Sequence, residues 1–137
     1  MTLNYHIEGS DFINAGNASS QIKKVLQQLN VDPKTIKRIV VALYEAEVNV
    51  VAHAYKGDIS AEITTEDITI TLDDEGPGIV DIDMAMTEGY STASPKVREM
   101  GFGAGMGLPN IKRNVDELNI QSEVKVGTKV VMKVKLS

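Results

Sequence analysis

Three short segments, in a fixed order and far apart along the chain, constrain its fold more than any other feature. Residues 45–49 read Glu-Ala-Glu-Val-Asn, residues 74–78 read Asp-Glu-Gly-Pro-Gly, and residues 101–107 alternate glycine with Phe, Ala and Met. A carboxylate beside an amide, an acidic glycine turn and a glycine ladder before a helix are the parts of a nucleotide site. Their order and spacing therefore predict an ATP site that the fold assembles from distant segments.

Length and composition predict one soluble domain over residues 1–137. A chain of 137 residues can bury one hydrophobic core but is short for two. The net charge of -5 disfavours nucleic acid as a partner, because phosphate backbones attract Lys- and Arg-rich faces. The chain has no cysteine, no basic and apolar leader, and no apolar run long enough to span a bilayer. We expect a cytoplasmic protein that binds neither nucleic acid nor membrane.

Apolar spacing in the first half predicts a strand and two helices. Apolar and polar residues alternate over residues 3–8, which is typical of a half-buried strand. Helical spacing predicts a first helix within about 12–29. Asp32 and Pro33 suit the N-cap and first position of a long helix that runs to about Tyr55. Residues 56–58, Lys-Gly-Asp, are expected to end it.

The second half predicts strands at 59–63 and 68–72, a helix from Pro109 to about Leu118, and a closing hairpin. In that hairpin we place Val124 and Val126 on the first strand and Gly127-Thr128 at the turn. The expected fold is α+β, a two-layer sandwich with about three helices on one mixed, mostly antiparallel sheet of about five strands.

Glu45 and Asn49 are the candidates for phosphoryl-transfer chemistry. They are four residues apart on the long helix, so they share a face, and the apolar stripe points roughly away from them. An amide oxygen can ligate a magnesium ion already held by phosphates, and a carboxylate can accept a proton from the nucleophile. The alternative is a solvated helix face that happens to carry both residues.

Two neighbours of this pair fit a structural role better. Glu47 falls near the apolar stripe, where a carboxylate needs a partner such as Tyr5 or His6. His53 lies one turn beyond Asn49, and a hydrogen-bonded histidine near the helix end is favoured over a ligand or a base.

Asp74 and the glycines after it suit an adenine. The aspartate directly follows a strand, and its carboxylate can accept a hydrogen bond from the exocyclic amine of the base. Gly76 and Gly78 allow a base to approach the backbone closely. The alternative for this short motif is an ordinary acidic turn.

The glycine ladder suits a phosphate chain. Glycines before a helix expose backbone amides, and the helix dipole adds positive potential there. A Walker A loop is excluded because Leu and Pro follow Gly107 where Lys and Ser or Thr are required, and a dinucleotide fingerprint lacks its third glycine. A flexible linker is the remaining alternative. The cations near the ladder are Lys96, Arg98, Lys112 and Arg113.

Together the segments resemble the GHKL ATPase superfamily with its Bergerat fold, and within it the small anti-sigma regulatory factors that are serine/threonine kinases. Residues 44–55 resemble the N box, residues 74–79 the G1 box and residues 103–111 the G2 box, while Gly127-Thr128 resembles the final box. The resemblance spans nearly the whole chain, and the run over residues 107–118 is closer to the switch-kinase branch.

The resemblance implies roles for individual residues. Glu45 would be the general base, Asn49 the magnesium ligand, and Asp74 the reader of the adenine amine, assisted by Thr128. Gly76 and Gly78 would shape the base pocket, and a lid over about residues 80–106 would cover the nucleotide. The residues that would hold the phosphates are Gly103, Gly105, Gly107 and Leu108.

The resemblance also implies partners. The acceptor hydroxyl would lie on a STAS-domain antagonist of the anti-anti-sigma type, and a sigma factor or a phosphatase would be a second partner. A homodimer is also implied. Two other functions stay open: a nucleotide-sensing binding module, and a slow ATPase in which Glu45 activates water.

Overall fold

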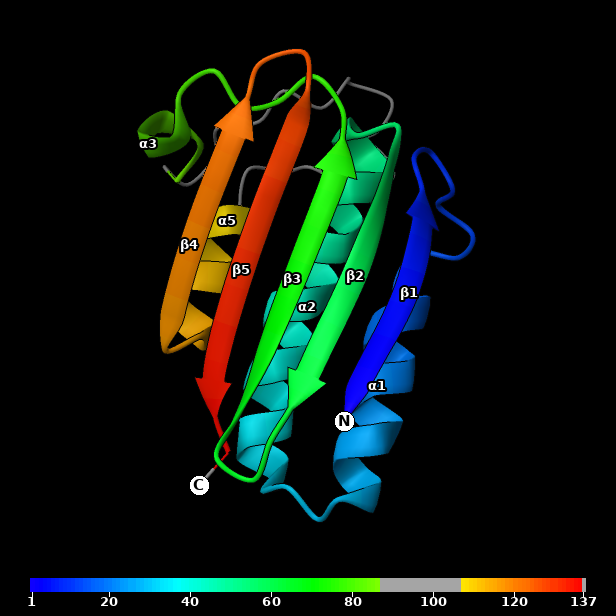
Figure 1. Ribbon diagram of the computed structural model, residues 1–137, viewed down its shortest axis with the longest axis vertical. Coiled ribbons are helices and arrows are strands. Elements are labelled where there is room, and N and C mark those ends of the chain that lie inside the picture. Colours follow the sequence, from blue (N-terminus) through cyan, green and yellow to red (C-terminus); the bar gives the residue numbers. More distant parts are fainter. Residues whose placement is uncertain (87–106, 137) are drawn as a thin grey trace.

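One five-stranded sheet with helices on one face makes up the fold of the computed structural model, which describes residues 1–86 and 107–136 (Figure 1). The strand order is β1-β2-β3-β5-β4, and all four pairings are antiparallel. The strands are β1 Thr2–Glu8, β2 Lys56–Ile63, β3 Asp67–Glu75, β4 Glu117–Glu123 and β5 Gly127–Lys135. The α+β, two-layer prediction is confirmed, but these strands form no mixed sheet.

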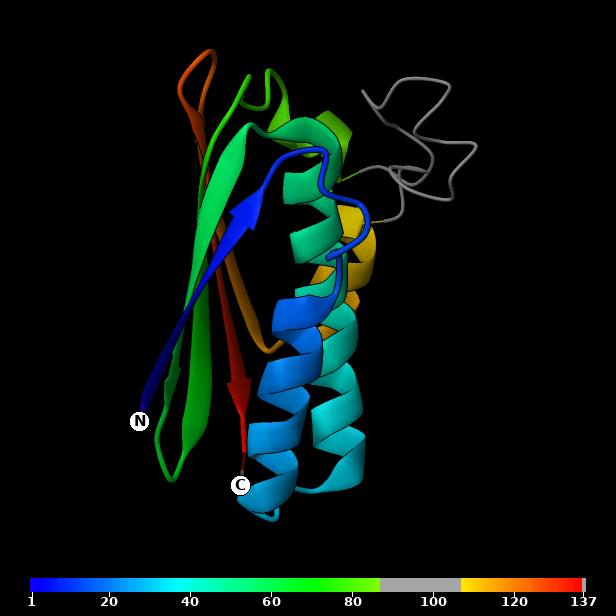
Figure 2. The ribbon, with the colours of Figure 1, turned by 90° about the vertical axis from the view of Figure 1, so that its right-hand side faces the viewer.

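The helices α1, α2 and α5 lie side by side on one face of the sheet, and the other face is open (Figure 2). The described helices, which include a short α3, are α1 Asn17–Gln28, α2 Pro33–His53, α3 Ile82–Ala85 and α5 Gly107–Asn114. The short α3 lies at the end of the sheet where β3 and α2 finish (Figure 1). Within the described residues, no helix has the length and apolar character needed to cross a membrane.

The start of α2 follows the prediction in detail. Asp32 Oδ1 accepts a hydrogen bond from the backbone N–H of Lys34 at 2.8 Å, and Pro33 occupies the first helical position. This cap satisfies one of the unpaired N–H groups of the first turn, and proline has none to satisfy. The helix ends at His53. Residues 56–58, which were expected to end this helix, are instead the first residues of β2.

Several other boundaries differ from the prediction, among them β3, which extends through Asp74 to Glu75. The first helix begins at Asn17 rather than near residue 12. The helix expected to reach Leu118 ends at Asn114, and Leu118 belongs to β4. Val124 and Val126 lie exposed in the hairpin turn, while Gly127-Thr128 begins β5. The backbone N–H of Val126 donates to Glu123 O at 3.0 Å, which closes the turn ahead of the glycine.

The core lies between the sheet and the helices.

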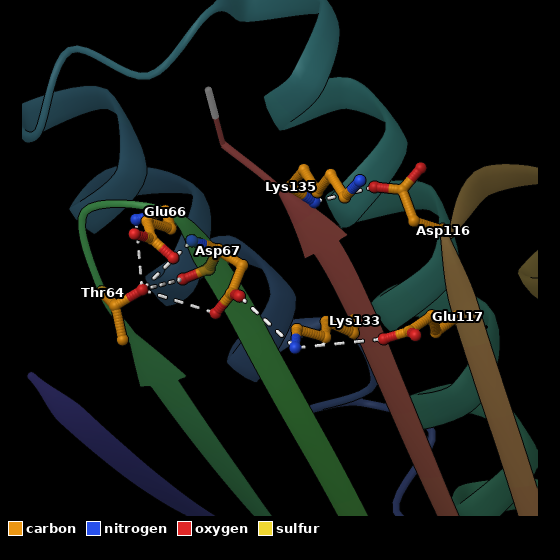
Figure 3. Close-up of polar contacts among 7 residues, drawn as sticks. All are labelled: Thr64, Glu66, Asp67, Asp116, Glu117, Lys133 and Lys135. Atoms are coloured by element: carbon orange, nitrogen blue, oxygen red, sulfur yellow. Dashed lines mark hydrogen bonds and ion pairs between the residues drawn. The ribbon is translucent and has the colours of Figure 1, made fainter.

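Polar contacts hold together the end of the molecule near the C-terminus (Figure 3). Lys133 Nζ lies 3.5 Å from Asp67 Oδ2 and 3.9 Å from Glu117 Oε2, so it spans three strands on the open face. Asp116 Oδ2 accepts the Lys135 N–H at 2.7 Å, and its Oδ1 accepts from Arg38 of α2 at 3.0 Å. These contacts fix the chain between α5 and β4.

Leu43 tests the packing of α2 on the sheet, because its side chain is 0% exposed. We expect Leu43→Ala to lower the free energy of unfolding by about 2–5 kcal/mol, through lost transfer energy and the cavity left behind. Leu29→Ala removes the same atoms from a residue that is 45% exposed and should cost far less. Urea unfolding of the two variants measures both values, and equal losses would contradict this packing.

Candidate functional site

Glu45 and Asn49 lie on the face of α2 that points away from the core. The opposite side of the helix carries the buried residues Ile36, Ile39 and Leu43. Glu45 and Asn49 are only partly buried. The predicted orientation of the helix is therefore confirmed. A carboxylate and an amide one turn apart are left available to a ligand on this face.

Glu47 has a structural role that the sequence did not reveal. It is 2% exposed, and its two oxygens accept hydrogen bonds from the start of α1 rather than from Tyr5 or His6. Oε2 accepts the N–H groups of Gly16 and Ala18 at 2.8 and 3.3 Å. Oε1 accepts the N–H and the hydroxyl of Ser19 at 3.0 and 2.7 Å. A carboxylate at a helix N-terminus also interacts favourably with the helix dipole, so Glu47 caps α1 from α2.

Asp74 lies near the end of β3 and is held by β5. Its Oδ1 accepts the backbone N–H of Thr128 at 3.0 Å. Burial is the largest influence on the carboxyl and raises its pKa; the Thr128 hydrogen bond lowers it, and the charge of Asp73 raises it again. The net effect is a pKa above the ordinary value of an aspartate.

Thr128 is anchored behind Asp74 by a small hydroxyl network. Its Oγ1 lies 2.9 Å from Ser122 Oγ of β4, and that hydroxyl accepts the N–H of Ile79 at 2.7 Å. Ser122 thus joins the hairpin to the segment that follows the glycine turn. Ser122 was not among the predicted site residues; its register opposite Thr128 across an antiparallel hairpin is the signal that could have found it.

Gly76 brings the end of α2 against the end of β3. A methyl group on Gly76 would lie 2.9 Å from Ala54 Cα, closer than real side chains allow. The Tyr55 N–H donates to Glu75 O at 2.8 Å, and Gly57 lies beside both Val50 and Asp74. Since Asn49 precedes Val50, the metal-ligand candidate and the adenine-binding candidate approach the same end of the fold.

Gly78 closes the glycine turn on the β4–β5 hairpin. It has φ +76°, and a methyl group there would lie 2.4 Å from Glu123 O. The Lys125 N–H donates to Pro77 O at 2.8 Å. The turn is therefore packed on the hairpin, which fixes the path of the chain away from Asp74.

The start of α5 lies beside Glu45. Asn110 Nδ2 donates to Glu45 Oε1 at 3.5 Å, so the first turns of α5 face the middle of α2. Leu108 and Pro109 are buried, and Gly107 is the first residue of the helix. The N–H groups of a first helical turn have no partner within the helix, and with the helix dipole they favour an anion next to the Glu45 and Asn49 face.

The other candidate residues lie at helix ends or outside the described residues. Lys112 and Arg113 lie on the last turn of α5, opposite its N-terminal end. Burial lowers the pKa of His53, the last residue of α2. The predicted residues outside the described ranges are Gly101, Gly103, Gly105, Lys96, Arg98 and residues 87–106 of the lid.

Two hollows in the described structure lie elsewhere. A cavity of about 360 Å³ lies between β1 and the start of α1, with His6, Asp11 and Glu47 in its lining. A shallow hollow of about 500 Å³ lies on the open face of the sheet and includes Asp58 and Lys129. Neither is lined by Glu45, Asn49 or Asp74, so both are separate from the candidate site.

The described part of the site fits a magnesium nucleotide by the chemistry of its donors. Asp74 offers acceptor oxygens next to a glycine that leaves no room for a side chain, and α5 offers an anion-binding helix start. In the described residues no group of three His, Cys, Asp or Glu could hold a metal ion. The amide oxygen of Asn49 is of a kind that could ligate a magnesium ion already held by phosphates.

Comparison with known proteins assigns the family. The histidine kinase-like ATPase domain matches residues 10–134, which is most of the chain. The chain belongs to this family. The resemblance to the GHKL type of ATPase is thereby confirmed.

Relatives of this ATPase domain include an anti-sigma factor and a kinase. The anti-sigma F factor of Clostridium novyi (strain NT) is 35% identical over an alignment of 130 residues, which covers 90% of this chain and 87% of that protein. The serine/threonine-protein kinase RsbT of Bacillus subtilis (strain 168) is 32% identical over an alignment of 112 residues, which covers 79% of this chain and 78% of that protein. Both names belong to the group of small regulatory kinases that the motifs resemble.

A solved structure supports the fold of this ATPase domain. The crystal structure of the RsbU and RsbW domains from Mycobacterium tuberculosis matches 99% of this chain with a TM-score of 0.68 and 17% identity. The chain spans 32% of that longer protein. At this identity the likeness is one of fold, and it agrees with the antiparallel sheet and its helical layer.

The raised pKa of Asp74 predicts a pH-dependent stability. When the native pKa exceeds the unfolded one, stability falls as the pH rises between the two values. Asp74→Asn keeps an oxygen for the Thr128 N–H but does not titrate. We therefore expect the variant to gain stability relative to wild type as the pH rises above about 4, in urea unfolding at several pH values.

The control is Glu62→Gln, which changes an exposed carboxylate on the open face of the sheet. Its stability relative to wild type should follow a different pH profile from that of Asp74→Asn. A difference between wild type and Asp74→Asn that stays constant from about pH 3 to 7 would contradict a raised pKa at Asp74.

Proposed function

We propose that this chain is an ATP-dependent serine/threonine protein kinase of the anti-sigma regulatory type. The observation that carries the proposal is the position of Glu45. It lies on the outer face of α2, one turn from Asn49 and in contact with the start of α5. Binding a nucleotide does not require a carboxylate at this place, whereas activating a hydroxyl nucleophile does.

The proposed reaction assigns one role to each side chain. Glu45 would accept the proton of a serine or threonine hydroxyl on the acceptor. The oxygen of that hydroxyl would then form a bond to the γ-phosphorus of ATP. The bond from that phosphorus to the bridging oxygen breaks, and ADP leaves. Asn49 would ligate the magnesium ion that neutralises phosphate charge, and Asp74 would accept a hydrogen bond from the adenine amine.

The remaining candidate residues would complete the nucleotide site. Thr128 would hold Asp74 in place through its backbone N–H. Gly76 packs against Ala54 and Gly78 against Glu123, so the two glycines would shape the turn beside the base. The glycine ladder and the start of α5 would bind the phosphates, under the lid. The residues proposed for this are Gly103, Gly105, Gly107 and Leu108.

The proposed acceptor is a small STAS-domain antagonist in a cytoplasmic partner-switching pathway. The names of the relatives support this class, because one is an anti-sigma F factor and another a serine/threonine-protein kinase. A sigma factor or a phosphatase as a second partner, and a homodimer, stay predictions. The alternative functions are a nucleotide sensor that changes its partner affinity without transfer, and a slow ATPase.

Glu45→Gln separates the kinase from the sensor. The amide keeps the size and the hydrogen-bonding oxygen of the side chain but cannot accept a proton. We expect phosphate transfer to a STAS-domain protein to fall by about 10²–10⁴-fold, while the dissociation constant for ATP changes little. Labelled ATP measures transfer, and calorimetry measures binding.

Glu62→Gln is the control, because it makes the same change on the open face of the sheet and should leave transfer unchanged. If wild type binds ATP but labels no acceptor, the sensor is favoured and the kinase is refuted. If wild type releases inorganic phosphate but labels no acceptor, the slow ATPase is favoured.

Asn49→Ala tests the proposed magnesium ligand. Without its amide oxygen, the protein should lose most of the gain in ATP affinity that magnesium gives to wild type. Its affinity for ATP measured in a chelator should match that of wild type, because the contacts to adenine are unchanged. Asn119→Ala, on the exposed side of β4, is the matched control. An Asn49→Ala protein with the full magnesium effect would rule Asn49 out as the ligand.

A further inference from the structure

Among the described residues, Asn110 of α5 donates a side-chain hydrogen bond to the Glu45 carboxylate. The mechanism proposed above gives Asn110 no role. Its Nδ2 lies 3.5 Å from Glu45 Oε1, and the pair joins residues 65 positions apart. Both side chains are partly buried, in a region where α2 and α5 pack together. Hydrogen bonds of catalytic groups are often long in a free enzyme and shorten when substrate is bound.

Arg113 determines which end of the Asn110 amide faces Glu45. A guanidinium can only donate, and Arg113 Nη1 donates to Asn110 Oδ1 at 3.3 Å. The oxygen is therefore the end turned toward Arg113, and the NH₂ group is left to donate to the carboxylate. Since oxygen and nitrogen of an amide are otherwise easily exchanged, this third residue gives the contact its direction.

The backbone around Asn110 is held as well. Asn114 Nδ2 donates to the Asn110 carbonyl at 2.8 Å, one turn along α5. Pro109 and Ile111, on either side, are buried. The position of Asn110 is thus set by its neighbours on α5, independently of Glu45. A residue that orients another group must be fixed in this way by contacts of its own.

We propose that Asn110 is a positioning residue that holds the Glu45 carboxylate toward the acceptor hydroxyl. A neutral amide can orient a carboxylate without neutralising the charge that makes it a base, whereas Lys or Arg in its place would form an ion pair. Asn110 also lies three residues after Gly107, where the chain leaves the glycine ladder. The base and the phosphate-binding end of α5 are therefore connected by one side chain. This inference rests on the proposed kinase function.

A series at Asn110 tests the proposal. Asn110→Ala should lower kcat for phosphate transfer by about ten- to a hundredfold, as expected for losing a hydrogen bond to a charged group. The KM for the acceptor and the dissociation constant for ATP should stay within about twofold of wild type, because Asn110 is assigned no contact with either. Asn110→Gln, which restores an NH₂ group, should recover part of kcat, and Asn110→Asp should fall below Asn110→Ala because like charges repel.

Asn119→Asp and Asn119→Ala make the same changes on the exposed side of β4 and should leave kcat unchanged. A purely structural role would instead make kcat follow the urea unfolding midpoint across the Asn110 series. If Asn110→Ala retains the kcat of wild type, or if KM rises and kcat does not fall, the proposal is overturned.

A spectroscopic measurement tests the contact without turnover. In ¹⁵N–¹H NMR spectra of the intact protein, Glu45→Gln should shift the side-chain NH₂ resonances of Asn110 and leave those of Asn119 in place. Unmoved Asn110 resonances would refute the contact even in an active kinase. Conversely, if Glu45→Gln shifts the Asn110 resonances but the wild-type protein transfers no phosphate, the proposed function is refuted and Asn110 has no base to position.

Discussion

The close approach of α2 to the end of β3 is the constraint on which the candidate site depends. Gly76 lies so near Ala54 that no side chain fits between them, and Tyr55 continues the contact by donating its N–H to Glu75. This contact brings a helix that carries a carboxylate and an amide to the strand that carries Asp74. A side chain at Gly76 would push α2 and β3 apart, and the two halves of the site with them.

Opposite faces of α2 serve different purposes within a few residues. Glu45 and Asn49 remain partly exposed, whereas Glu47, between them, is buried and caps α1 with four hydrogen bonds. Leu43 and its neighbours fix the rotation of the helix on the sheet. A buried carboxylate with all its partners supplied by one helix end can stabilise a single arrangement of α1 and α2. The outer face is thereby presented in one orientation.

Local chemistry predicted some elements well, and long-range contacts decided the others. The Asp32 cap and the proline after it are local, so the start of α2 could be predicted. Apolar spacing through Leu118 fits a helix, but Asp116 binds the backbone of Lys135 and ends the helical run. One partner of Glu47, Ser19, lies 28 residues away, and Asn110, which donates to Glu45, lies 65 residues away. No spacing rule reveals such pairs.

We propose that α2, the end of β3 and the start of α5 converge on one magnesium nucleotide. Paramagnetic broadening of amide resonances by Mn²⁺·ATP tests this convergence, because the effect falls steeply with distance from the ion. We expect the strongest broadening around Asn49 and Asn110, with adenine-dependent shifts at Asp74 and Thr128. Broadening centred on His6 and Asp11, in the cavity between β1 and α1, would contradict it.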